Sequence, residues 1–156
     1  MVYNITKHPN HKFGLIYEEL AANIICEANN VRLEHVQRDY KFDFMTSDGL
    51  TYEVKANKKS VELQSFFIET LQSIYNGKRW SCFKNSGLMT SKADFWMLWH
   101  GDVFLKIKLK HLKRLINTKT YPQRAGKNID NPTNRTRGFV VPVDDVMAFA
   151  VVYNIQ

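Results

Sequence analysis

The sequence predicts an α/β protein of the α+β type, in which helices flank a central mixed β-sheet. Two observations predict this class. Apolar residues recur at helical spacing near the N-terminus, and a succession of strand-like segments follows up to about residue 109. A length of 156 residues suits one domain, residues 1–156, with one hydrophobic core. The hydrophobic content of 44% is that of a globular protein rather than of a disordered chain.

The N-terminal part is expected to form a helix and then a β-hairpin. Residues 12–29 form the helix, because Phe13, Leu20 and Ile24 recur on one face. Residues 31–42 alternate between apolar and charged side chains, as a half-buried strand does. The next two strand-like segments, FDFM and LTYEVKA, are separated by a Ser-Asp-Gly turn, which predicts a hairpin.

A loop and a second hairpin are expected over the middle of the chain. Residues 65–71 form a strand, and the polar residues 72–92 form a loop. The apolar strand 93–99 and the alternating strand 103–109 follow each other closely and pair as a hairpin. Residues 110–117 form a short basic helix.

The last part of the chain is expected to be less regular. Residues 118–138 contain prolines, glycines and several cations, which predicts a basic loop or arm. We expect this arm to be poorly ordered alone and to clamp the backbone of bound DNA. Residues 139–156 end the chain with one or two short apolar elements, to which the sequence assigns no role.

The charge balance points to a polyanionic partner. The formal net charge is +7 and the isoelectric point is about 9.4, which favours nucleic acid as the partner of a small domain. Cys26 and Cys82 lie far apart and form no metal-type cluster, which fits a reducing cytosol. The first nine residues lack the apolar stretch of a signal peptide, and no apolar run approaches membrane-spanning length. A cytoplasmic protein without a membrane partner is therefore expected.

Two carboxylates and a lysine are expected to meet on the hairpin KFDFMTSDGLTYEVKA. Glu53 and Lys55 lie two positions apart on one strand and project from the same face, while Val54 points into the core. Asp43, before the turn, can reach that face. An E-x-K pair alone is common on exposed strands and contributes little, but Asp43 lies between two phenylalanines and the pair interrupts an apolar strand. Carboxylates are ligands for Mg²⁺ and a nearby lysine offsets charge, so the set indicates phosphodiester hydrolysis.

The pattern Asp43-x9-Glu53-x-Lys55 on a strand–turn–strand resembles the PD-(D/E)XK nuclease superfamily. Phe42 stands where that superfamily has its proline. Many members also carry a glutamate on the first helix. Both Glu18 and Glu19 could fill that place, and the spacing after Gly14 favours Glu18.

A second segment, NSGLMTSKADFWMLW, is similar to one in small phage and bacterial nucleases of this superfamily, as is FFIET with Glu69. The resemblance spans about residues 14–116. It implies a restriction-endonuclease-like fold and a DNA endonuclease that is restriction-like, homing or junction-resolving. It also implies that Asp43 and Glu53 bind Mg²⁺, for which Mn²⁺ can substitute, and that Glu18 and Lys55 are catalytic. The expected setting is the cytoplasm of a bacterium or phage-infected cell, and enzymes that cut both strands are often homodimers.

Further cations are candidate contacts to the DNA backbone, although a solvated surface would contain such residues too. Some follow the catalytic strand, one precedes Asp94, and the others lie in the arm. Asp94 itself is expected to satisfy a local turn. The candidate contacts are Lys58, Lys59, Lys92, Arg124, Lys127 and Arg135.

Two other functions remain open at this point. One is a non-catalytic nucleic-acid-binding module on the same fold, and the other is a phage interaction protein that inhibits a host factor. The histidines lack the spacing of a zinc site, and no phosphate-binding loop of the ATPase type occurs. Cleavage of DNA that requires a divalent metal ion distinguishes the nuclease from both alternatives.

Overall fold

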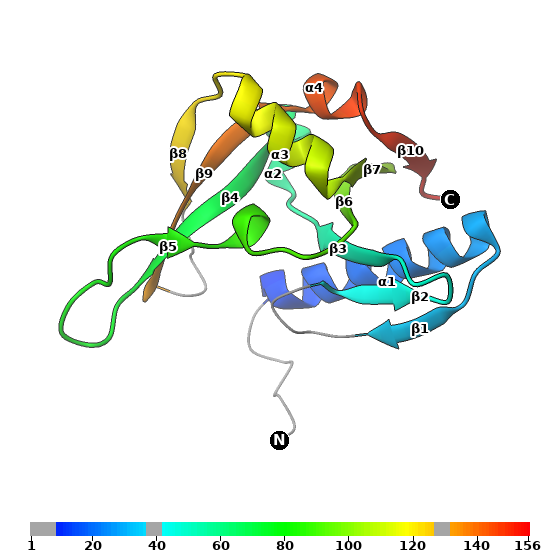
Figure 1. Ribbon diagram of the computed structural model, residues 1–156, viewed down its shortest axis with the longest axis horizontal. Coiled ribbons are helices and arrows are strands. Elements are labelled where there is room, and N and C mark those ends of the chain that lie inside the picture. Colours follow the sequence, from blue (N-terminus) through cyan, green and yellow to red (C-terminus); the bar gives the residue numbers. More distant parts are fainter. Residues whose placement is uncertain (1–8, 37–41, 127–131) are drawn as a thin grey trace.

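Two β-sheets with helices around them build the protein, whose computed structural model describes residues 9–36, 42–126 and 132–156 (Figure 1). The N-terminal elements are α1 (Pro9–Asn29), β1 (Leu33–Val36), β2 (Phe44–Thr46), β3 (Thr51–Lys55), α2 (Lys59–Leu63) and β4 (Ser65–Ile74). The remaining elements are β5 (Lys84–Asn85), the 3-10 helix η2 (Gly87–Met89), β6 (Phe95–His100), β7 (Val103–Lys108), α3 (Leu109–Thr118), β8 (Gln123–Gly126), β9 (Asn134–Pro142), α4 (Val143–Met147) and β10 (Val151–Asn154).

The larger sheet has six strands in the order β1-β2-β3-β6-β7-β10. Strands β3 and β6 run parallel, and the other neighbours are antiparallel, so the sheet is mixed. The predicted hairpins are β2–β3 and β6–β7, and both are confirmed. The predicted α+β class with a central mixed sheet is therefore confirmed as well.

Helix α1 covers one face of this sheet, as predicted for residues 12–29. Its fully buried Ala21 and Ile25 lie in one cluster with Tyr52, Val54 and Met97 of the sheet. Small alanines let the helix approach the strands closely, and each large side chain buried here contributes about 1.5–3 kcal/mol. Val54 therefore points into the core, which leaves its neighbours in the sequence on the opposite face.

A second cluster fills the opposite face of the sheet, between it and the smaller sheet with α3 and α4. Trp96 and Leu98 of β6 meet Ile68 of β4 and Val141 of β9 there. Trp99 belongs instead to the cluster under α1, so the two tryptophans face opposite ways, as their odd spacing predicts. Helix α3 corresponds to the predicted basic helix at residues 110–117.

The smaller sheet has the strand order β5-β4-β9-β8, and its long central pair is β4–β9. The register shifts between Glu69 and Leu71, where β4 has a bulge. Gly138 lies opposite this point, and a Cβ atom there would lie 2.2 Å from the carbonyl oxygen of Ile68. Glycine is therefore needed at position 138, where the backbones of β4 and β9 approach each other closely.

The smaller sheet corrects two predictions, for residues 72–92 and for residues 118–138. Strand β4 extends to Ile74 and is followed by β5 and η2, so the loop predicted over 72–92 is partly regular. The arm predicted over 118–138 instead contains β8 and the first half of β9. Strands β5 and β9 form because β4 supplies backbone partners from a distant part of the chain, and β8 in turn pairs with β9. In the six-stranded sheet, β1 corresponds to the predicted strand 31–42 but covers only Leu33–Val36. Residues 37–41 lie outside the described residues.

The C-terminal residues 139–156 form the end of β9, the short helix α4 and the edge strand β10, in line with the predicted short apolar elements. Among the described helices, none is both long and apolar enough to cross a membrane.

Candidate active site

Backbone pairing between the two strands of the β2–β3 hairpin extends to Asp43 and holds it against β3. The N–H of Asp43 donates to the carbonyl of Tyr52 at 2.8 Å, and its Oδ2 accepts from the N–H of Val54 at 2.6 Å. Asp43 immediately precedes β2 and pairs with the strand that carries Glu53 and Lys55. These two backbone contacts fix the carboxylate beside the alternating strand, as the hairpin pattern predicted.

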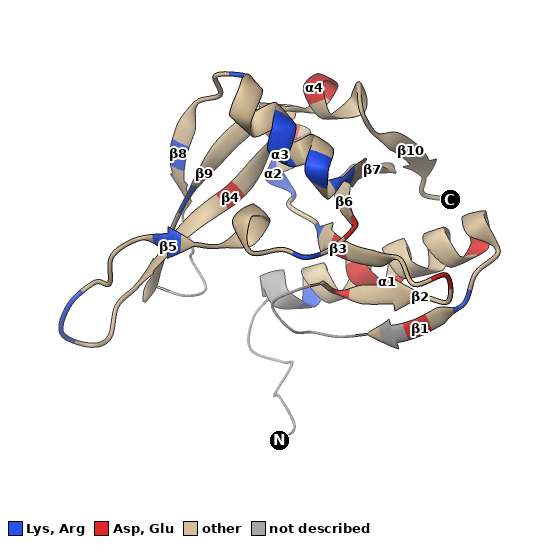
Figure 2. Ribbon diagram, viewed as in Figure 1, with Lys and Arg blue, Asp and Glu red and all other residues tan. Residues whose placement is uncertain are grey.

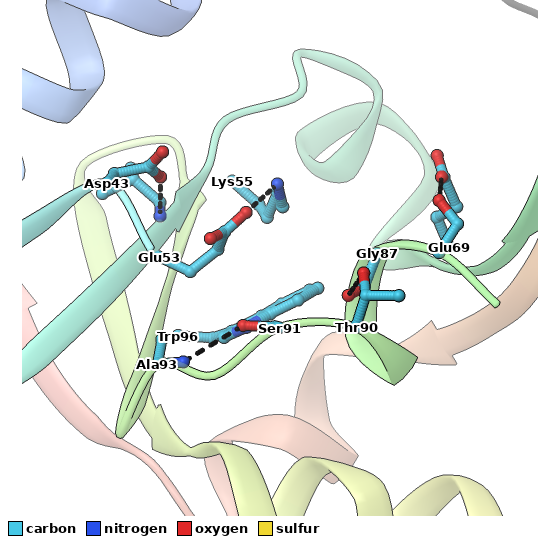
Figure 3. A network of polar contacts seen from close by, with 11 residues as sticks. Asp43, Glu53, Lys55, Glu69, Gly87, Thr90, Ser91, Ala93 and Trp96 are labelled. Atoms are coloured by element: carbon cyan, nitrogen blue, oxygen red, sulfur yellow. Dashed lines mark hydrogen bonds and ion pairs between the residues drawn. The ribbon is translucent and has the colours of Figure 1, made fainter. Parts of the chain in front are cut away.

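Glu53 and Lys55 form an ion pair on the face of β3 that lies opposite α1. The Lys55 Nζ donates to the Glu53 Oε1 at 2.5 Å, and it lies 5.4 Å from the ring centre of Trp96 on the neighbouring strand (Figure 3). The Glu53 side chain is 14% exposed, whereas that of Lys55 is 46% exposed. The carboxylate is therefore held close to the protein, and the ammonium is accessible to a molecule in solution.

A cleft of about 680 Å³ opens in front of this pair, between β3 and the smaller sheet. Glu53, Lys55 and Trp96 line one side of it. The other side comes from β4 and from the segment that leads into η2, and its lining includes Phe67, Glu69, Gln72, Asn85, Ser86 and Thr90. Figure 3 shows Glu53 and Lys55 on one side of this space and Glu69 and Gly87 on the other, with Asp43 beyond Glu53 and outside the lining of the cleft.

Glu69 was not predicted as a site residue, although its segment carried part of the resemblance. Its carboxylate accepts a hydrogen bond from the hydroxyl of Ser86, whose backbone N–H donates to Thr70 at 2.9 Å. The negative charge of Glu69 acts on Lys55 from across the cleft. No local signal in the sequence could place Glu69 here, because only the packing of the two sheets brings β4 in front of β3.

Gly87 is expected to be essential for holding Glu69 in place. Its backbone is left-handed, with φ of 50°, and a Cβ atom would lie 2.5 Å from the Glu69 carbonyl oxygen. Gly87→Ala should lower the free energy of unfolding by about 2–4 kcal/mol, through the left-handed strain and the clash together. Urea unfolding measures this loss.

Gly49→Ala is the matched control, because Gly49 also has a positive φ of 81° but no atom within 4 Å of its would-be Cβ. It should cost only about 1–2 kcal/mol. Equal losses in the two variants would mean that Glu69 yields to the added methyl group and is not held by the turn.

The surroundings in the site raise the pKa values of both Asp43 and Lys55. Burial, followed by the negative charge of Glu53, raises the pKa of Asp43 from 3.8 to about 7, against the effects of the Val54 N–H and Lys55. Glu18 on α1 adds a smaller increase. Desolvation lowers the pKa of Lys55, but attraction to Glu53, the hydrogen bond to Glu53, and Asp43 outweigh it, so the net shift is upward. Lys55 thus stays charged, while Asp43 gives up its proton only near neutral pH.

This arrangement predicts that the metal-free protein loses stability as pH rises from about 4 to about 7. The pKa of Asp43 is higher in the folded state than in the unfolded chain, so its contribution to stability is complete below pH 4 and is lost through pH 7. We expect a loss of about 1–3 kcal/mol, reduced from the full shift because the side chain is partly exposed. Urea unfolding in EDTA at several pH values measures it.

Asp43→Asn should flatten this dependence, whereas Asp102→Asn, at the exposed β6–β7 turn, should leave it unchanged. A stability that falls equally with pH in the wild type and in Asp43→Asn would contradict the assignment to Asp43.

The donor set fits a magnesium ion. Asp43 and Glu53 contribute hard oxygen atoms whose mutual repulsion a cation would relieve. Mg²⁺ commonly takes one or two carboxylates from a protein and completes its shell with water and phosphate oxygens. Within the described residues, no three His, Cys, Asp or Glu side chains are grouped closely enough to hold a metal by themselves. Glu18 acts on Asp43, which favours it over the exposed Glu19 as the helix glutamate.

The predicted DNA contacts lie in three places. Lys58 and Lys59 are exposed at the start of α2, with the Lys58 ammonium 4.9 Å from the ring centre of Phe13. Lys92 is exposed before β6. Arg124 and Arg135 belong to β8 and β9 rather than to a mobile arm, and Lys127 lies outside the described residues.

Asp94 has a structural role, but the bonds of its carboxylate lie between two strands and not within the local turn that the sequence predicted. Its Oδ2 accepts from both the N–H and the hydroxyl of Thr51 at 2.9 Å, which ties the start of β6 to the start of β3. It does not line the cleft of Glu53 and Lys55.

Compared with known proteins, the chain matches no family model, no curated protein and no solved structure.

Proposed function

We propose that the protein is a magnesium-dependent DNA endonuclease of the PD-(D/E)XK kind. The observation that carries this proposal is the Glu53–Lys55 pair at one wall of an open cleft, with the carboxylate of Asp43 held against the same strand and acting on Glu53 and Lys55 by its charge. Two carboxylates whose charges repel each other, next to an accessible ammonium, suit a cation and a phosphodiester better than they suit a solvated surface. The mixed sheet with α1 on one face is compatible with the restriction-endonuclease-like fold that we propose for it.

Asp43 and Glu53 would hold the cation, and Mn²⁺ could replace Mg²⁺. When bound, the cation polarises the scissile phosphate and makes water more acidic. Asp43 uses Oδ2 for the Val54 N–H, so its carboxylate is oriented before any ligand arrives. Glu53 is held by its contact with Lys55.

Lys55 acts as a positive charge rather than as a base. Its raised pKa keeps it protonated at neutral pH. A fixed ammonium beside the scissile phosphate stabilises the additional negative charge that develops in the transition state. Glu18 lies on α1 and does not line the cleft. Its negative charge raises the pKa of Asp43 and so favours the protonated form of that carboxyl group.

The proposal is tested on three substrates: supercoiled plasmid, linear duplex and a four-way junction, each with Mg²⁺, Mn²⁺ or EDTA. We expect cleavage of at least one substrate with either metal and none in EDTA. The preferred substrate then separates restriction-like or homing cleavage from junction resolution. Binding of DNA without cleavage under every condition would favour the non-catalytic module instead.

A further inference from the structure

The outer part of the smaller sheet is strongly and uniformly basic. We call residues 71–85, 123–126 and 132–138 the wing; they include the end of β4, β5, β8 and the first half of β9. These ranges contain no aspartate or glutamate. Figure 2 shows the blue segments on β5, β8 and β9, and in the loop that precedes β5. The six cations, all exposed, are Lys78, Arg79, Lys84, Arg124, Arg135 and Arg137.

Two of these cations lie over aromatic rings. The guanidinium carbon of Arg135 lies 3.9 Å from the ring centre of Trp80, and that of Arg137 lies 4.2 Å from the ring centre of Phe83. Both arginines alternate along β9 with the buried Thr136, so they project from one face. A stacked guanidinium presents its N–H groups along its edge, in the geometry that matches a phosphate.

The loop that carries the two rings is tightly hydrogen-bonded. The Ser73 hydroxyl donates to the Ser81 carbonyl at 2.6 Å, and the Ser81 N–H donates to the Ile74 carbonyl at 2.9 Å. At the tip, the Asn76 side chain accepts from the N–H groups of Lys78 and Arg79, each at 3.0 Å. The cations are thus arranged before any partner binds, which lowers the entropy cost of binding.

The wing is continuous with the cleft of the candidate active site. Gln72 and Asn85 belong to the wing and also line that cleft, opposite Glu53 and Lys55. A long polyanion lying in the cleft would therefore continue onto the wing. A solvated surface normally mixes both signs of charge, and among the described residues no ion pair involves a wing cation.

We propose that the wing binds the phosphate backbone of duplex DNA beyond the point of cleavage, and that it sets affinity without reading sequence. This inference rests on the proposed nuclease function. Trp80 and Phe83 serve as supports for arginines, and the ring faces that the arginines cover are not available to stack on bases. The contacts that remain are charged side chains to phosphate, which carry no sequence information directly.

The test compares the salt dependence of DNA binding in EDTA for the wild type and a triple variant, Lys84→Gln, Arg135→Gln and Arg137→Gln. The probes are two 30-base-pair duplexes of unrelated sequence. Each lost phosphate contact lowers the slope of log K against log salt by about 0.9, so three should flatten it by about two to three units. Affinity near 0.1 M salt should fall about 100-fold, and equally for both duplexes.

Two further variants guard against a purely structural effect. Arg135→Lys with Arg137→Lys keeps the charges and should retain the wild-type slope. Arg32→Gln, Lys106→Gln and Lys108→Gln remove the same charge at or next to the six-stranded sheet and should also leave the slope unchanged. Equal flattening by this distant triple variant would overturn the proposal, because net charge alone would then explain the result.

The results distinguish a failure of the wing proposal from a failure of the nuclease proposal. A wild type that cleaves DNA, with a wing variant whose slope and affinity are unchanged, would overturn the wing proposal and leave the nuclease intact. A flattened slope without cleavage by any form of the protein would support the wing and contradict the nuclease. A wild type that binds neither duplex even at low salt would overturn the wing proposal and point to an acidic protein as the partner.

Discussion

Lys55→Ala is expected to abolish DNA cleavage while DNA binding survives. The variant removes the ammonium that contacts Glu53, on the wall of the cleft where the phosphate would lie. Loss of a fixed charge that stabilises a transition state typically lowers the rate by about 10²–10³-fold. Binding should change far less, because only one cation is lost. Single-turnover cleavage and binding in EDTA measure the two effects.

Lys110→Ala is the matched control for this prediction. Lys110 is an exposed lysine of α3 and does not line the cleft of Glu53 and Lys55. Its cleavage rate should stay within about threefold of the wild-type rate, because a single exposed cation contributes little. A Lys55→Ala variant as active as this control would remove Lys55 from the mechanism.

Asp43→Asn and Glu53→Gln are expected to lose both Mg²⁺ binding and cleavage while keeping the fold. Each amide conserves the shape of the side chain and removes the charge that attracts the cation. An amide oxygen at position 43 can still accept from the Val54 N–H, so the hairpin should stay closed. In the absence of metal, Asp43→Asn should be more stable than the wild type above pH 7, because a repelled carboxylate has been neutralised.

Calorimetric titration with Mg²⁺ at pH 8 measures the affinity, and Glu62→Gln, on the exposed face of α2, serves as the control. The control should bind Mg²⁺ as the wild type does. If both Asp43→Asn and Glu53→Gln bound Mg²⁺ with wild-type affinity, the assignment of these two carboxylates as ligands would be contradicted.

Local patterns were sufficient to predict the Asp43–Glu53–Lys55 group. A turn sequence and a period of two place these side chains within one hairpin, where few alternatives exist. The same reasoning placed Trp96 and Trp99 on opposite faces of the sheet. These predictions depend on neighbours along the chain, and the structure confirms the positions.

The smaller sheet could not be predicted in this way. Strand β9 contains glycine, proline and arginines, which favour a loop, and its partner β4 lies about 70 residues earlier. Its backbone groups are satisfied only once β4 is in place, and the bulge at Glu69 needs Gly138 opposite it. For the same reason, the sequence does not predict that Glu69 lines the cleft. It also places Arg135 and Arg137 in an arm, whereas in the structure they lie over Trp80 and Phe83.

We propose that Asp43, Glu53 and Lys55 cut DNA with the help of magnesium. The most direct test is the single-turnover cleavage rate of one labelled substrate as Mg²⁺ is titrated, with the wild type and Glu53→Gln purified side by side. We predict a wild-type rate that saturates with Mg²⁺ and vanishes in EDTA, and a rate at least about 10²-fold lower in Glu53→Gln. Equal rates in the two proteins, or cleavage that persists in EDTA, would contradict it.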